Sequence, residues 1–446
     1  MKPTFLFAIF SCCILIVACK SQSGTSENNK PDSNASNVTH PIQGNTDSQV
    51  ATTDIEKPKP EGYDKNISLP QNLTNFSFDF YKFLSEESKG KNLCFSPVSM
   101  NIALAMVYEG ARNNTLEQMS QTMHLPDNQE LFSNEFASYL RSIELLAKDS
   151  AVEFNLANRV FVESSFPILE SYRSAIKQAF NGAFEQMDFI NKFAESEQYI
   201  NKWVEKMTKD RIKELLPAGT LSSETKLVLV NAIYIKARWK YIFDEKATMK
   251  KDFHINGSNI VQTDFMIRKQ KGIRYYTNND ICAIELPYTC DGISLIIIKP
   301  HKGSSENLSS FIPTGSDYEK MLSDMKYHTV HMEIPKFKTE TSFSLSDPLV
   351  AKGMSDAFSP RADFSGITGN NDLSVSEVLQ KVFFEVDEKG SEAAAASAVV
   401  MRATSAAPNH EMEEIMYFIA NQPFIYILKE NNSDTPLFIG QYISPQ

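Results

Sequence analysis

The sequence predicts a single large α+β domain. The chain has 446 residues, of which 42% are hydrophobic and 30 are Phe, so it can bury a large core. Apolar residues recur at helical spacing in several segments before residue 210, whereas runs rich in β-branched and aromatic residues dominate after residue 226. Because helices come first and do not alternate with the strands, we expect mixed or antiparallel sheets rather than a parallel βαβ fold.

Four helices are expected from the periodic segments. The first covers Asn72–Ser85, where Phe76, Phe80 and Leu84 recur near helical spacing. The second begins after the Ser-Pro pair at 96–97, runs over 100–109 and stops at Gly110. The last two cover residues 168–180 and 194–210.

Strands are expected wherever β-branched and aromatic residues cluster between turn residues. The predicted strands are 154–163, 226–236, 281–288, 293–299, 329–337, 378–386, 415–419, 424–429 and 437–443.

The N-terminus is expected to be a processing signal followed by a tether. Lys2 and the apolar run Phe5–Val17 are typical of a signal peptide, and the run is too short for a membrane span. It ends at Cys19 in a pattern that resembles a bacterial lipobox; an ordinary secretory signal with a chance cysteine is the alternative. We therefore expect a signal peptide at 1–18, lipidation of Cys19, a flexible tether through residue 67 and a folded domain over 68–446.

The expected location is the cell envelope. Lys20 follows the lipidated cysteine, as in lipoproteins that are passed to the outer membrane, and the face of that membrane stays open. The tether has a random-coil reach of roughly 35–40 Å, which would let the domain clear the membrane surface.

Composition and motifs exclude several function classes. The net charge is −11 and there is no basic stripe, which argues against a nucleic-acid partner. Hydrolase, metalloprotease, P-loop and dinucleotide motifs are absent. His328 and His331 are the only close histidines and would face opposite sides of a strand, so neither a metal site nor a cofactor is expected. Cys94, Cys282 and Cys290 are expected to be buried thiols, with a Cys282–Cys290 bridge as the alternative.

Residues 387–408 are the most informative segment, because the chain carries a run of small residues after Gly390. The Ala-rich composition, with Glu392 near its start, would suit a capped helix. The segment is equally suited to a strand, since no proline interrupts Ser391–Thr404. One face of that strand would carry Ser391, Ala393, Ala395, Ser397, Val399 and Met401, and the other Glu392, Ala394, Ala396, Ala398, Val400 and Arg402.

Nine motifs follow one another in an order that resembles the serpin family across residues 68–446. They are Asn92–Ser99, Asn158–Phe161, Ile200–Val204, Leu229–Trp239, Glu285–Tyr288, Pro335–Phe337, Ala362–Gly366, Asn421–Phe424 and Pro436–Gly440. The resemblance implies three β-sheets, about nine helices and an exposed reactive loop.

The resemblance also implies a function. In this family a serine protease cleaves the loop and forms an acyl-enzyme with it. The cut loop then inserts into the central sheet and distorts the active site of the protease before deacylation. The chain would be a suicide substrate and not an enzyme in turnover terms, and we expect a monomer. A non-inhibitory serpin-fold lipoprotein that is only cleaved is the alternative.

The resemblance assigns roles to residues of the loop and of the sheet. The predicted reactive bond is Thr404–Ser405, which suits elastase-like proteases, with Arg402 and trypsin-like proteases as the alternative. The inhibitory hinge would comprise Glu388, Gly390, Ser391, Glu392, Ala393, Ala394, Ala395 and Ala396. Ser96, Ser99, Asn231 and Gln380 resemble the polar shutter that lets the central strands part, and Trp239, Lys336 and Glu388 resemble the breach above it.

Overall fold

The computed structural model describes residues 64–445, except 89, 181–183, 257–258, 302–307 and 392–413. Within these residues, nine α-helices and fifteen strands confirm the α+β class. The helices are α1 (Leu69–Glu87), α2 (Pro97–Tyr108), α3 (Asn113–Met123), α4 (Gln129–Ala147), α5 (Glu170–Phe180), α6 (Phe189–Met207), α7 (Gly315–Asp324), α8 (Ser346–Ala351) and α9 (Ser365–Thr368).

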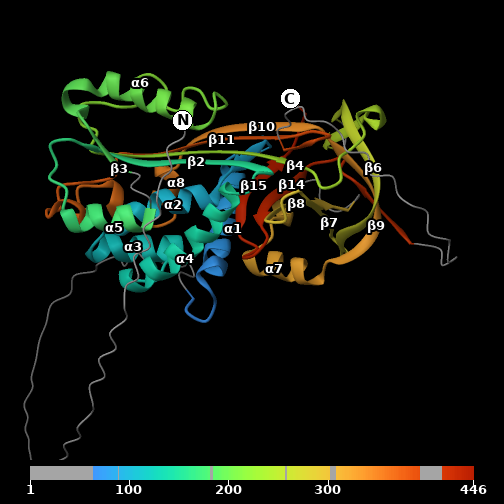
Figure 1. The fold of residues 1–446 in the computed structure, drawn as a ribbon, viewed down its shortest axis with the longest axis horizontal. Coiled ribbons are helices and arrows are strands. Elements are labelled where there is room, and N and C mark those ends of the chain that lie inside the picture. The colour runs from blue at the N-terminus through green and yellow to red at the C-terminus, as the bar shows by residue number, and fades with distance from the viewer. Residues whose placement is uncertain are drawn as a thin grey trace, which may run out of the picture. The chain divides into compact units, whose positions relative to one another are not determined.

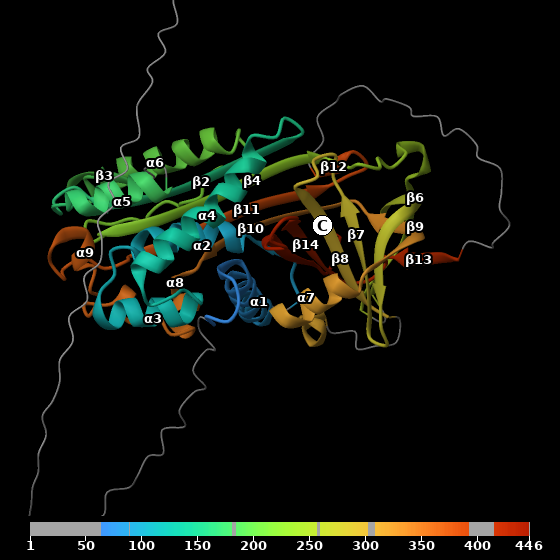
Figure 2. The same ribbon diagram turned by 60° about the horizontal axis from the view of Figure 1, so that its bottom comes forward.

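The six-stranded sheet lies between helices (Figures 1 and 2). Its order is β10 (Phe337–Ser344), β11 (Glu377–Val386), β12 (Gly390–Ser391), β4 (Leu227–Arg238), β2 (Val152–Glu163) and β3 (Phe184–Met187). The sheet is mixed, because β11 and β4 are parallel while β10–β11 and β2–β4 are antiparallel.

Both faces of this sheet are apolar at its centre. Side chains at alternate positions of β4, including Val228, Val230 and Ala232, join a core cluster with residues of α6. The intervening Leu229 and Ile233 point the other way and join the main core with α2. Burial on both faces explains why the sequence of β4 is mostly apolar instead of alternating between apolar and polar residues.

The second sheet has nine strands. Its order is β1 (Leu93–Phe95), β15 (Pro436–Tyr442), β14 (Phe424–Glu430), β8 (Ile293–Pro300), β7 (Ile281–Pro287), β6 (Asn259–Thr277), β9 (Lys326–Pro335) and β13 (Ile415–Ile419), with β5 (Met249–Asn256) paired to β6.

The ladders of the described residues form two sheets where three were expected. The long strand β6 pairs with β9 over residues 265–275 and with β7 over 274–277, and so makes one sheet of what would otherwise be two. A register shift at Gly272, whose φ is +76°, bends the strand between these partners.

Most elements that the sequence predicted are present within a few residues, and the omissions have physical causes. Strands β5, β6 and β10 were missed because polar, exposed residues interrupt them, and β1, β3 and β12 were missed because each is too short to show a pattern. Helices α3, α4, α7, α8 and α9 were also missed. The last two are short, but α4 carries Phe132, Phe136 and Ile143 on one buried face at helical spacing.

Candidate functional site

The two-residue strand β12 occupies a position between β4 and β11, which we call the central junction. Over most of the junction the two strands pair directly, from Glu377 with Val228 to Val382 with Ile233. Four residues further along, Ser391 lies between them and pairs with Val386 on one side and Ala237 on the other. The start of the predicted hinge is therefore already seated in the sheet.

A tight turn over residues 387–390, the hinge turn, delivers Ser391 to this position. The Asp387 carboxylate accepts the backbone N–H groups of Lys389 (2.8 Å) and Gly390 (3.1 Å), and the Asp387 N–H donates to the Gly390 carbonyl (2.9 Å). Gly390 has a φ of +156°, and a Cβ there would lie 1.9 Å from the Ala237 carbonyl oxygen. Only glycine fits this close approach to β4.

Trp239 and Tyr288 form the wall against which the hinge turn packs. Their rings stack with centroids 4.4 Å apart. The Trp239 indole N–H donates to the Asp387 carbonyl at 2.8 Å, and its backbone N–H donates to the Lys389 carbonyl at 2.9 Å. The Tyr288 and Ser391 hydroxyls share a hydrogen bond of 2.5 Å, and burial keeps the pKa of Tyr288 well above its ordinary value.

Glu388 and Lys336, the predicted breach pair, are 3.0 Å apart. Glu388 is buried and also accepts from the Thr248 hydroxyl at 2.8 Å. Burial alone would raise the pKa of Glu388, but hydrogen bonds from its own backbone N–H, Thr248 and Lys336 hold that pKa below the ordinary value. Partial burial opposes the charge on Lys336, yet the contact with Glu388 holds the pKa of Lys336 above its ordinary value.

The predicted shutter residues form a closed circuit of buried hydrogen bonds, which we call the polar ring. Gln380 of β11 donates to the Asn231 side chain (2.7 Å) and to the Ser96 carbonyl (3.0 Å), and accepts from the Ser96 N–H (2.9 Å). Asn231 of β4 donates to Asn158 of β2 at 3.1 Å, and Asn158 also accepts from the Ser99 hydroxyl at 2.7 Å. The Ser99 N–H closes the ring on the Ser96 hydroxyl at 3.3 Å. The ring ties the start of α2 to three adjacent strands.

Asn158, Tyr288, Asp387 and Thr248 belong to these contacts, but no sequence pattern assigned them a role. Asn158 and Tyr288 stood in the motifs that carried the family resemblance, which is the signal that could have pointed to them. The partners of Asn158, Tyr288 and Thr248 are distant in the chain and are visible only in the folded protein, whereas the Asp387 carboxylate accepts from residues two and three positions away.

Several predicted site residues lie outside the described residues. They are Cys19, Glu392, Ala393, Ala394, Ala395, Ala396, Arg402, Thr404 and Ser405. Cys94, Cys282 and Cys290 are free and buried, so the alternative of a Cys282–Cys290 bridge is wrong.

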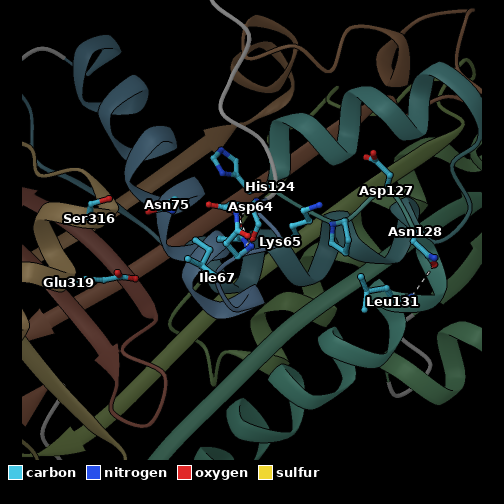
Figure 3. Close-up of a pocket in the computed structure, with 13 residues that line it drawn as sticks. Asp64, Lys65, Ile67, Asn75, His124, Asp127, Asn128, Leu131, Ser316 and Glu319 are labelled. Carbon is cyan, nitrogen blue, oxygen red and sulfur yellow. Dashed lines mark hydrogen bonds between the residues drawn. The ribbon is translucent and has the colours of Figure 1, made fainter.

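A pocket of about 790 Å³ lies beside the start of α1 and shares no residue with the hinge or the polar ring (Figure 3). The residues that line it come from the segment before α1, from α1, from the α3–α4 connection, from α4 and from α7: Asp64, Lys65, Asn66, Ile67, Asn72, Asn75, His124, Pro126, Asp127, Asn128, Leu131, Ser316 and Glu319. The part of the chain that the structure describes holds no cluster of His, Cys, Asp and Glu suited to a metal ion. None of the described helices combines the length and apolar character needed to cross a membrane.

Comparison with known proteins identifies what this architecture resembles. The family model described as "Serpin (serine protease inhibitor)" matches residues 71–445. The leukocyte elastase inhibitor of Xenopus laevis is 38% identical over 390 residues, covering 85% of this chain and 100% of that protein. An uncharacterized serpin-like protein of Thermococcus kodakarensis is 35% identical over 434 residues, covering 97% of both chains.

Solved structures show the same fold. The crystal structure of uncleaved ovalbumin has a TM-score of 0.75 at 25% identity, covering 85% of this chain and 100% of that one. Serpin48 of the insect Tenebrio molitor has a TM-score of 0.75 at 28% identity, covering 84% of this chain and 98% of that one.

The polar ring predicts a large effect of removing Gln380. A Gln380→Leu substitution leaves the Ser96 backbone groups and the Asn231 oxygen buried without this partner, so we expect unfolding to become easier by about 2–5 kcal/mol. Gln380→His, which can still donate and accept, should cost much less. Denaturant unfolding measures both, with the exposed Gln262→Leu as the control; equal stability of Gln380→Leu and wild type would contradict the role of the ring.

The Glu388–Lys336 pair predicts a pH-dependent stability difference. The lowered pKa of Glu388 means that its charge stabilises the fold above the unfolded value of 4.5, and that this contribution is lost as pH falls through the folded value. The raised pKa of Lys336 means that its contribution is present below 10.5 and is lost as pH rises through the folded value.

Glu388→Gln should therefore lower thermal stability at neutral pH, by about 1 kcal/mol because Lys336 is partly exposed. The difference from wild type should shrink in acid below pH 4.5. Calorimetry over this pH range measures it. Asp291→Asn, which breaks the exposed pair with Lys240, should change stability little at any pH; a difference between Glu388→Gln and wild type that does not vary with pH would exclude the pair as its cause.

Proposed function

Because this chain belongs to the serpin family, we propose that it inhibits serine proteases as a suicide substrate. The observation that carries the proposal is the seat of Ser391 between β4 and β11. A loop whose first residue already pairs with both strands needs only to extend along the same path to become a full strand of the sheet.

The register at Ser391 supports the fit of the rest of the loop. Continuing the pairing one residue at a time places Ser397 opposite both Asn231 and Gln380, six positions from the Ser391 level on each strand. Ala393, Ala395 and Val399 would share the face of Ser397, on the side of the main core. Small side chains suit that buried face, and a serine suits the polar ring.

The proposed reaction uses the bond Thr404–Ser405. The catalytic serine oxygen of the protease attacks the Thr404 carbonyl carbon, the peptide bond breaks, and the amine of Ser405 leaves with a proton from the protease. The ester to Thr404 remains while residues 391–404 insert, a length of about 46 Å. Insertion must finish before water cleaves the ester, because hydrolysis of the ester regenerates active protease.

The small side chains of Ala403 and Thr404 favour elastase-like targets, in keeping with the name of the Xenopus laevis relative. Cleavage after Arg402 by a trypsin-like protease is the second candidate, and it would shorten the inserted strand by two residues. A serpin-fold lipoprotein that proteases only cleave is the alternative function.

We also propose that lipid on Cys19 holds the protein at the bacterial cell envelope, in the outer membrane. The apolar run before Cys19 and the polar, aromatic-poor stretch after it support this location. The tether would let the domain meet proteases as a monomer away from the membrane surface.

Elastase-like and trypsin-like proteases test the inhibitory mechanism. We expect an SDS-resistant complex. Mass spectrometry should show that the released C-terminal peptide begins at Ser405. Cleaved protein should unfold at a much higher temperature than uncleaved protein. Ala395→Glu would bring a charge to the buried face of the inserted strand, so it should be cleaved at the same bond without forming complex.

The matched control is Ala406→Glu, which lies beyond the inserted segment and should still form complex. Complete cleavage of wild type without complex would sink the inhibitor proposal. A peptide that begins at Ala403 would move the reactive bond to Arg402.

Lipidation is tested in a bacterial host that modifies lipoproteins. Wild type should incorporate labelled palmitate and fractionate with membranes, and Cys19→Ser should lose both properties. Cys13→Ser, within the predicted signal peptide, should keep them. Equal labelling of Cys19→Ser and wild type would rule out this anchor.

A further inference from the structure

Ser391 and Tyr288, the hinge pair, meet in a fully buried contact. Their hydroxyl oxygens are 2.5 Å apart, and the residues are 1% and 0% exposed. A buried hydroxyl that loses its partner destabilises the fold, because it has given up its hydrogen bonds to water without gaining one in the protein. The contact therefore favours the conformation in which Ser391 sits between β4 and β11.

Tyr288 can hold Ser391 in one place because it is itself fixed. Its ring stacks on Trp239 at 4.4 Å with an interplanar angle of 20°, and the two residues also form a backbone bridge. Trp239 in turn donates to the carbonyls of Asp387 and Lys389, on either side of Glu388. The hinge turn and Ser391, the residue after it, are thus held by one rigid unit of two aromatic rings.

The seat of Ser391 changes what strand insertion requires. The direct β4–β11 ladder ends at Ile233 and Val382, and Ser391 enters at the level of Ala237 and Val386. The strands are therefore parted at this end before any cleavage. The first residue to enter sets direction and register and pays most of the closure entropy, whereas each later residue adds ladder bonds to a strand already aligned.

We propose that the Tyr288 hydroxyl is a positioning group that nucleates loop insertion by holding Ser391 in the central junction. This inference rests on the proposed suicide-substrate function. Tyr288 is 0% exposed, so it cannot touch the protease, and it acts on insertion without acting on acylation. The acyl-enzyme partitions between insertion and hydrolysis, so slower insertion yields more cleaved inhibitor for each trapped protease.

The test compares Tyr288→Phe, Ser391→Ala and the double variant with wild type. Tyr288→Phe keeps the aromatic stack and removes only the hydroxyl. We expect it to raise several-fold the number of inhibitor molecules consumed per protease inactivated, and to leave the second-order rate of loop acylation within twofold. In the double variant neither hydroxyl is left without its partner, so its effect should be smaller than the product of the single effects.

Tyr172→Phe is the matched control, because Tyr172 is 3% exposed and its hydroxyl donates to the Met106 carbonyl at 2.9 Å. It should lower thermal stability and leave the partition unchanged. An unchanged partition in Tyr288→Phe overturns the proposal. An equal rise in Tyr172→Phe, or strictly multiplicative single effects, overturns it as well.

A second readout separates this inference from the proposed function. The chain has two tryptophans, so in a Trp203→Phe background Trp239 is the sole reporter of the hinge. Its fluorescence after rapid loop cleavage should change more slowly in Tyr288→Phe than in its parent. If the wild-type loop inserts without trapping the protease, the proposed inhibition is overturned, and the rate of the fluorescence change still tests whether Tyr288 nucleates insertion. If the wild-type loop never inserts, both the proposed inhibition and the role of Tyr288 are overturned.

Discussion

The junction between β4 and β11 is the constraint on which the rest of the structure depends. Six residue pairs join these strands in parallel, from Glu377–Val228 to Val382–Ile233, and both faces of the junction are packed in apolar core. A parallel ladder is slightly less stable per residue than an antiparallel one. The junction is thus closed by ordinary strand pairing. A new strand that entered it would replace the β4–β11 pairing with two antiparallel pairings, one to each strand, as β12 already does at one end.

The two regions that hold the junction use different chemistry. The polar ring consists of amides and hydroxyls, so its hydrogen bonds do not depend on a titrating group near neutral pH. At the hinge, by contrast, an ion pair lies beside a neutral hydroxyl pair. Salt and extremes of pH act on Glu388 and Lys336 and leave the Tyr288–Ser391 contact as it is. The polar ring, which resists separation of the strands in the middle of the junction, and the contacts that hold Ser391 at its end can therefore be changed independently.

The proposed insertion path between β4 and β11 would accept only small side chains on its buried face. Gly390 passes so close to the Ala237 carbonyl that any side chain would collide with it. In the proposed inserted strand, the same register would bring Ala393, Ala395 and Ser397 to the face of the sheet that packs on the main core. Larger residues there would need the core to open before the strand could enter. The composition that left the segment ambiguous between helix and strand is the composition that this path can accept.

By itself the sequence determined the fold class, the family resemblance and most of the apolar strands, because these depend on local periodicity and on motif order. It placed β11 and β13 within a residue of their observed bounds, and it selected Ser96, Ser99, Asn231 and Gln380 as one polar group. It missed β5, β6 and β10, whose polar residues are tolerated because partner strands satisfy their backbone, and it missed the short strands β1, β3 and β12.

Only the tertiary structure decided that Asn158 completes the polar ring, that two of the expected sheets are continuous, and that Ser391 meets Tyr288 across 103 residues of chain. Such contacts join segments whose spacing is set by the whole fold, so no local pattern encodes them.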